Sequence, residues 1–230
     1  MLRVPFPTRW VWAGLLLLAA CAPASAQLGW LHGSGSGFKS YGKITAFHLD
    51  VPLAAPALQS LSQFPLKDFA YVLYPTAGSG AEGMVPGNTE TGAPLSIPVV
   101  RGMYDHRNDA SDPIEFEAIK ADDAKLPKAP GGNALLVYSV LYSGQDLANC
   151  TGIVQVLELD QRQLMLTDQF SYDCRGGAGA EWNPAKRQLT IRSARYSLGD
   201  KPCCPSQYDS VVFKLDGKSV KTGDVILNNQ

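Results

Sequence analysis

The chain has 230 residues, of which 45% are hydrophobic and 18% charged, with 20 Lys plus Arg against 21 Asp plus Glu. A chain this apolar is not intrinsically disordered, and a net charge of −1 lacks the basic excess typical of nucleic-acid-binding proteins. The 22 Gly and 16 Pro, with a charged fraction below the roughly 25% of average domains, favour short strands and turns over long helices.

Residues 1–26 have the features of a bacterial signal peptide. Arg3 and Arg9 precede the apolar run 11–20, which ends in small residues and Pro23. The run has about ten residues, whereas a membrane-spanning helix needs roughly 20. We therefore expect an exported protein.

Two processing sites lie in this segment. Residues 18–21 (LAAC) resemble the lipobox of bacterial lipoproteins, in which Cys21 would be acylated and become the new N-terminus. Because alanine follows Cys21, the resemblance implies an outer-membrane anchor. The alternative is cleavage after Ala26, which follows a small-x-small pattern and would give a periplasmic or secreted protein. Either cut removes Arg3 and Arg9, which leaves 18 basic against 21 acidic residues and a charge of −3.

The first elements after the signal are a tether and a set of short strands. Residues 27–37 contain GSGSG and predict a flexible tether, followed by a single β-rich domain over 38–230. Residues 41–51 and 69–74 predict strands. In the same part of the chain, residues 57–63 favour a short helix, 76–98 a long loop, and 112–125 either a helix or a strand.

Five strand-length segments rich in β-branched and aromatic residues follow, separated by turn sequences. Consecutive strands with tight links predict an antiparallel meander or sandwich, and one or two short helices are compatible with this mainly β class. These segments are 134–142, 151–159, 163–172, 188–196 and 210–215, and an Asp-Gly turn at 216–217 follows the last of them.

Four cysteines remain after processing, and outside the cytoplasm four cysteines predict disulfides. If Asp160 and Gln163 close a hairpin, paired positions sum to 323, and Cys150 with Cys174 sums to 324. These two cysteines would then lie nearly opposite each other, which leaves a vicinal pair of Cys203 and Cys204. The alternative is a crossed arrangement, in which Cys150 and Cys174 each bond to one of the adjacent cysteines.

Residues 189–218 resemble the C-terminal signature of LppP/LprE-type bacterial lipoproteins and related secreted proteins. The residues that carry the resemblance are Asp200, Cys203, Cys204, Pro205 and Ser206, in a strand, Gly-Asp turn, CCPS and strand sequence. It covers about 30 residues of the chain. The resemblance implies an exported location and a paired role for the adjacent cysteines, and it implies no chemistry.

Catalytic and metal-binding patterns are weak in this sequence. His32, His48 and His106 have no partner at metal-ligand spacing, and no Ser, His and Asp are selected as a triad by their spacing. A polar cluster (Asp105, His106, Asp109 and Asp112) and two alternating acids (Glu115 and Glu117) are better explained as solvated surfaces. We therefore predict no catalytic residue, no metal site and no cofactor.

Residues 175–182 (RGGAGAEW) are the candidate binding surface. The glycines permit close approach of another chain, and Arg175 and Trp182 are residue types enriched at binding hot spots, with Glu181 beside them. The alternative is that Trp182 packs in the core. The sequence thus predicts a non-enzymatic envelope protein with an unknown protein partner or ligand; a hydrolase or a periplasmic inhibitor of a lytic enzyme is the alternative.

Overall fold

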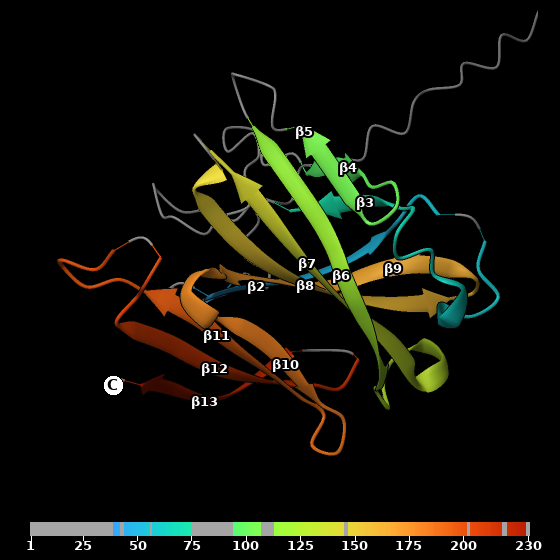
Figure 1. Ribbon diagram of the computed structural model, residues 1–230. Coiled ribbons are helices and arrows are strands. Elements are labelled where there is room, and N and C mark those ends of the chain that lie inside the picture. Colours follow the sequence, from blue (N-terminus) through green and yellow to red (C-terminus); the bar gives the residue numbers. More distant parts are fainter. Residues whose placement is uncertain are drawn as a thin grey trace, which may run out of the picture.

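The computed structural model describes residues 39–41, 44–55, 57–74, 94–106, 113–144, 147–201, 203–217 and 220–228 (Figure 1). These residues form a mainly β structure in which every paired strand is antiparallel. Helical structure in this part of the chain is limited to short 3-10 turns such as Leu61–Gln63. The predicted fold class is confirmed.

The large sheet has seven strands in the order β1-β2-β9-β8-β7-β6-β5. Strands β6 to β9 form an antiparallel meander, while β2 pairs with β9 from far away in the sequence. Three of the five segments predicted to form one meander lie here, as β7, β8 and β9, and the other two, β11 and β12, lie in a second sheet. The strands are β1 Lys39–Tyr41, β2 Ile44–Pro52, β5 Met103–His106, β6 Ile114–Lys125, β7 Asn133–Ser143, β8 Asn149–Asp160 and β9 Gln163–Asp173.

A second sheet, β10-β11-β12-β13, covers one face of the large sheet (Figure 1). Its strands are β10 Gly179–Asn183, β11 Gln188–Arg195, β12 Gln207–Leu215 and β13 Val220–Asn228. The core between the two sheets includes Phe170 from β9 and Phe213 from β12, whose ring centroids are 4.8 Å apart. Burial of this apolar surface is the main stabilising contribution to the contact between the sheets.

The opposite face of the large sheet is covered by a two-stranded sheet of β3 (Ala70–Leu73) and β4 (Leu95–Pro98). Tyr71 packs there against Phe69 and Phe116 with ring centroids 5.3 and 5.2 Å apart. The large sheet is therefore covered on both faces, which explains why β7, β8 and β9 are buried along nearly their whole length.

Several details of the sequence-based expectation are corrected. Of the two alternatives expected for 112–125, the strand is observed, over 114–125, because Ile114, Phe116 and Ala118 alternate inward against the core. The short helix expected at 57–63 is only a 3-10 turn at its end. The expected loop 76–98 contains β4 over its last residues, and β10 and β13 were not predicted as strands.

Candidate functional site

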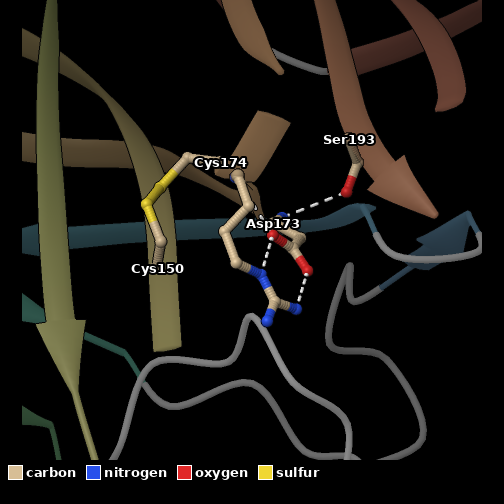
Figure 2. Close-up of polar contacts among 5 residues, drawn as sticks. Cys150, Asp173, Cys174 and Ser193 are labelled. Atoms are coloured by element: carbon tan, nitrogen blue, oxygen red, sulfur yellow. Dashed lines mark hydrogen bonds and ion pairs between the residues drawn. A yellow bond between two sulfur atoms is a disulfide. The ribbon is translucent and has the colours of Figure 1, made fainter. Parts of the chain in front are cut away.

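The β8–β9 hairpin brings Cys150 and Cys174 together. Asp160 pairs with Gln163 at the turn, as the sequence predicts, but a β-bulge between Val156 and Leu157 shifts the register by one residue. Thr151 consequently pairs with Asp173, so the two cysteines just beyond this pair lie opposite each other. Their Cα atoms are 5.4 Å apart and their sulfur atoms are bonded (Figure 2). This geometry is consistent with the hairpin disulfide and not with the crossed arrangement.

Arg175 is held by a fully buried carboxylate at the end of the same hairpin. Its Nε and Nη2 donate to the two oxygens of Asp173 at 3.0 and 2.5 Å, and its guanidinium lies 4.5 Å above the ring of Tyr196. The backbone N–H of Asp173 donates to Ser193 Oγ of β11 at 3.0 Å (Figure 2). These contacts fix the crossing from the large sheet to the second sheet.

The two cysteine-containing loops pack against each other. The turn Arg175–Gly177 touches Pro205 of the loop between β11 and β12, and we call this turn, together with the described loop residues 197–201 and 203–206, the clasp. A Cβ atom on Gly176 would lie 2.1 Å from Cδ of Pro205, and φ of Gly176 is +60°, so this position requires glycine. Tyr208 donates its hydroxyl hydrogen to the carbonyl of Gly176. The RGG and CCPS sequences, far apart in the chain, thus form one structure.

Side-chain and backbone bonds fix the loop between β11 and β12. Asp200 accepts hydrogen bonds from the backbone N–H groups of Ser197 and Ser206 at 2.7 and 2.9 Å, and these bonds lower the pKa of its carboxyl group. The sulfur atoms of Cys203 and Cys204 are paired within the loop. Leu198, at the turn of the loop, is fully exposed. A fixed loop therefore presents a large apolar side chain to solvent.

The residues of the predicted binding surface have different environments. Only 13% of the Arg175 side chain is exposed, and its guanidinium is committed to Asp173. Trp182 is half-buried and packs against the core between the two main sheets, whereas Glu181 beside it is exposed. Of the three residues, Glu181 is therefore the one most available to a partner.

The structure also brings together a cluster of titratable side chains that was not predicted from the sequence. The His48 ring is bonded through Nδ1 to Asp168 at 3.0 Å and through Nε2 to Asp50 at 3.1 Å. Glu158, only 2% exposed, lies nearby, and its Oε1 has no hydrogen-bond partner. Bulges in β2 and in β8–β9 adjoin these residues. The sequence signals were His48 and Asp50 on one strand face, and acids inside otherwise apolar strands.

The protonation of this cluster follows from burial and from charge pairing. The hydrogen bond to Asp168 raises the pKa of His48 to about 9, although burial opposes the rise. Burial, with the nearby carboxylates, raises the pKa of Glu158 to about 7. Burial also raises the pKa of Asp168, and the charged His48 ring works against that rise. At neutral pH the cluster therefore contains an imidazolium and a partly protonated glutamic acid.

Other candidate positions do not form a site. Tyr104 and His106 bond to each other at 2.9 Å on β5, and Glu115 and Glu117 lie on β6. Within the described ranges no group of three or more His, Cys, Asp or Glu side chains could hold a metal ion, and no helix is long and apolar enough to cross a membrane. Predictions that lie outside the described residues concern the signal peptide with Cys21, the tether, His32, Asp109 and Asp112.

The described residues form a mainly β protein with a covered central sheet and a disulfide between Cys150 and Cys174. Comparison with protein-family models, with curated proteins and with solved structures found no match. The resemblance to LppP/LprE-type lipoproteins therefore stays an expectation from the residues around Cys203 and Cys204.

Proposed function

We propose that this chain is an exported bacterial envelope protein with a non-enzymatic binding role, and that the clasp is its docking surface. The observation that carries the proposal is the fixed loop that exposes Leu198. An apolar side chain held out by a rigid loop loses little conformational entropy on binding, so its burial contributes efficiently to affinity. The signal-like residues 1–26 support export.

Covalent cross-linking in envelope extract, followed by capture of the tagged protein, tests the docking surface. We expect Leu198→Ser to lose a partner that the unaltered protein captures. The matched control is Ile119→Ser, because Ile119 is also an exposed apolar residue but lies on β6, far from the clasp in the sequence. Equal capture by all three proteins would contradict docking through the clasp.

Export and lipidation are tested separately by detergent partitioning and by mass spectrometry of the mature N-terminus. We expect an acylated Cys21 and partition into the detergent phase, with Cys21→Ala remaining in the aqueous phase. A mature chain that starts at Gln27 would instead indicate a freely soluble exported protein. An unprocessed chain that starts at Met1 would contradict export.

A hydrolytic enzyme is the second candidate, and the titratable cluster is the observation that favours it. Glu158 with a pKa of about 7 has the protonation behaviour of a general acid. However, both His48 nitrogens are occupied by carboxylates, so this ring does not activate a serine in the arrangement observed. Hydrolysis of peptidoglycan or ester substrates by the unaltered protein, lost in Glu158→Gln, would favour the enzyme. No hydrolysis by the unaltered protein would favour the binding role.

A further inference from the structure

Strand β10 forms one edge of the second sheet, and in the part of the chain that the structure describes no strand pairs with its outer edge. Its pairing with β11 is regular from Gly179 to Asn183, without a bulge. Beyond that ladder, residues 179–183 make no backbone hydrogen bond to another described residue. The strand also contains no Pro or Lys, which commonly protect exposed edges. Its outer edge is therefore able to pair with a further strand.

Gly179 is not required by the fold of a single chain. Its φ is not positive, and a Cβ atom at this position would have no atom within 4 Å beyond its chain neighbours. Glycine weakens a strand, because it loses more conformational entropy on folding and has no side chain to pack. Glycine inside a strand often marks the close approach of another backbone, which points to a partner at this edge.

Two exposed charges lie close to the same edge. Glu181 belongs to β10, and Arg192 of β11 is the ladder partner of Gly179. The Arg192 guanidinium donates to the carbonyl of Gly177 at 3.3 Å and lies 4.2 Å from the ring centroid of Tyr208, and both of these groups are neutral. Among the described residues neither Glu181 nor Arg192 forms an ion pair. Both charges are therefore available to a partner.

A two-fold axis through Ala180 makes this edge complementary to itself. If two copies pair their β10 strands antiparallel about this axis, Gly179 lies opposite Glu181 of the second copy. In the same register Ala178 lies opposite Trp182 of the second copy. Ala178, Ala180 and Trp182 are all half-buried along the core between the two main sheets. Each large side chain at this edge thus meets a small one.

This register also brings the two unpaired charges together. Strands lie about 4.8 Å apart, so Arg192 would be about 10 Å from Glu181 of the second copy between Cα atoms, with Gly179 between them. An arginine and a glutamate side chain together span this distance, and glycine places no side chain in the way. Because the axis repeats the contact, each dimer would contain two such ion pairs.

Other registers fit less well. An axis through Glu181 would place two carboxylates directly opposite each other, which is destabilising. An axis through Trp182 would place Pro184, which has no N–H, opposite Ala180 and would move Arg192 away from the glutamate. A shift by one residue would set apolar side chains of one copy against the polar face of the other.

We propose that β10 is a homodimerisation surface, in which two copies join their four-stranded sheets edge to edge about Ala180. The occupant is a second copy, because the segment 178–182 itself supplies the matching sizes and Arg192 supplies the matching charge. The paired segment is short, so we expect a weak dimer. The inference does not depend on Leu198 and goes beyond the proposed function.

Sedimentation analysis of the purified full-length protein over a range of concentrations tests the dimer, with Cys21→Ala in every variant so that no lipid anchor contributes. We expect a monomer–dimer equilibrium. Glu181→Arg and Arg192→Glu should each weaken it about tenfold, because each sets like charges together. An equimolar mixture of these two variants should dimerise as the unaltered protein does, because both ion pairs of the mixed dimer are again of opposite charge. The matched control, Lys214→Glu on β12, reverses an exposed charge away from this edge and should have no effect.

Ala180→Cys tests the register independently of charge. Cysteines on the axis would lie directly opposite each other, with Cα atoms about 4.5–5.5 Å apart, so mild oxidation should give a covalent dimer. Asn183→Cys is the control, because its two copies would be about 20 Å apart along the paired strands and should not cross-link.

Three results would overturn the β10 dimer. One is a protein that stays monomeric at every concentration and gives no cross-link through Ala180→Cys. The second is a dimer that Glu181→Arg and Arg192→Glu leave unchanged, and the third is a mixture of these variants that does not restore association. Because the measurement uses the isolated protein, failure of the dimer is distinct from failure of docking through Leu198.

Discussion

Gly176 is the residue on which the clasp depends most directly. Its carbonyl accepts a hydrogen bond from Tyr208, and a Cβ atom at this position would overlap the ring of Pro205, so the position combines a positive φ with a contact that excludes a side chain. The sequence indicates that three glycines permit close approach, but it does not identify which of them needs the space. That distinction depends on the position of Pro205 against the turn Arg175–Gly177.

Gly176→Ala should destabilise the protein by about 2–4 kcal/mol, because it adds a steric clash to the strain of a positive φ. Chemical denaturation measures the change. Gly177→Ala is the control for strain alone, since φ is +82° there but no atom lies within 4 Å of the added Cβ, and it should cost about 1 kcal/mol. Equal losses in the two variants would contradict the contact with Pro205.

The raised pKa values of Glu158 and His48 predict that the protein becomes less stable as pH rises. Glu158 holds its proton more tightly when folded, with a pKa of about 7 against 4.5, so stability decreases as pH rises from 4.5 through 7. His48 also has a raised pKa, about 9 against 6.5, so its contribution is complete below pH 6.5 and is lost as pH rises through 9. Both groups therefore make the folded state more stable at mildly acidic pH than at alkaline pH.

Glu158→Gln should therefore increase the free energy of unfolding at pH 8 by about 1–3 kcal/mol and flatten its decrease between pH 4.5 and 7. Urea unfolding at a series of pH values measures both effects. Glu117→Gln on the exposed side of β6 serves as the control and should follow the unaltered protein. A pH profile for Glu158→Gln that is parallel to that of the unaltered protein would show that Glu158 does not titrate in this range.

Among the elements, the β8–β9 hairpin shows how a local irregularity decides a covalent bond. The sequence predicts the turn at Asp160 and Gln163 and places Cys150 one residue away from perfect opposition to Cys174. The bulge opposite Val156 and Leu157 adds one unpaired residue, Thr167, to β9, and this shift brings the two cysteines opposite each other. A bulge leaves little trace in a sequence, because it is set by packing on both faces of the sheet.

Replacing both Cys150 and Cys174 by serine should lower the free energy of unfolding by about 2–4 kcal/mol, since the disulfide closes a loop in the unfolded chain. A bond between the adjacent Cys203 and Cys204 closes no such loop. Replacing both of these cysteines by serine should therefore lower the free energy of unfolding, measured by thermal unfolding, by less than about 1 kcal/mol. Non-reducing peptide mapping provides the independent check. Recovery of a peptide that links Cys150 to Cys203 would contradict the hairpin disulfide.

Strand β6 illustrates the limit of pattern analysis at this scale. Residues 112–125 fit either a helix or a strand, because a charged segment with few apolar residues has little periodicity. Pairing with β7 along almost its whole length selects the strand. The strongly apolar segments that became β7, β8 and β9 were predictable because the same residue types suit a strand buried on both faces.

At the scale of the whole molecule, the two main sheets share one core and should unfold together. Replacing either Phe170 or Phe213 by leucine should lower the free energy of unfolding by about 1–3 kcal/mol. Because their rings are in contact, the double variant should show a coupling of about 0.5–1.5 kcal/mol. Denaturant unfolding followed by fluorescence and by circular dichroism measures these values. Additive effects, or transitions that do not coincide, would contradict a shared core.

The sequence alone determined the mainly β class, the turn of the β8–β9 hairpin and the expectation of export, because these depend on composition and on patterns within about ten residues of one another. Only the tertiary structure decided how the strands divide into sheets, that the RGG and CCPS segments form one clasp, and that His48, Asp168 and Glu158 meet. These features join residues that are far apart in the chain, and such contacts are selected by the burial of shared apolar faces and not by local propensity.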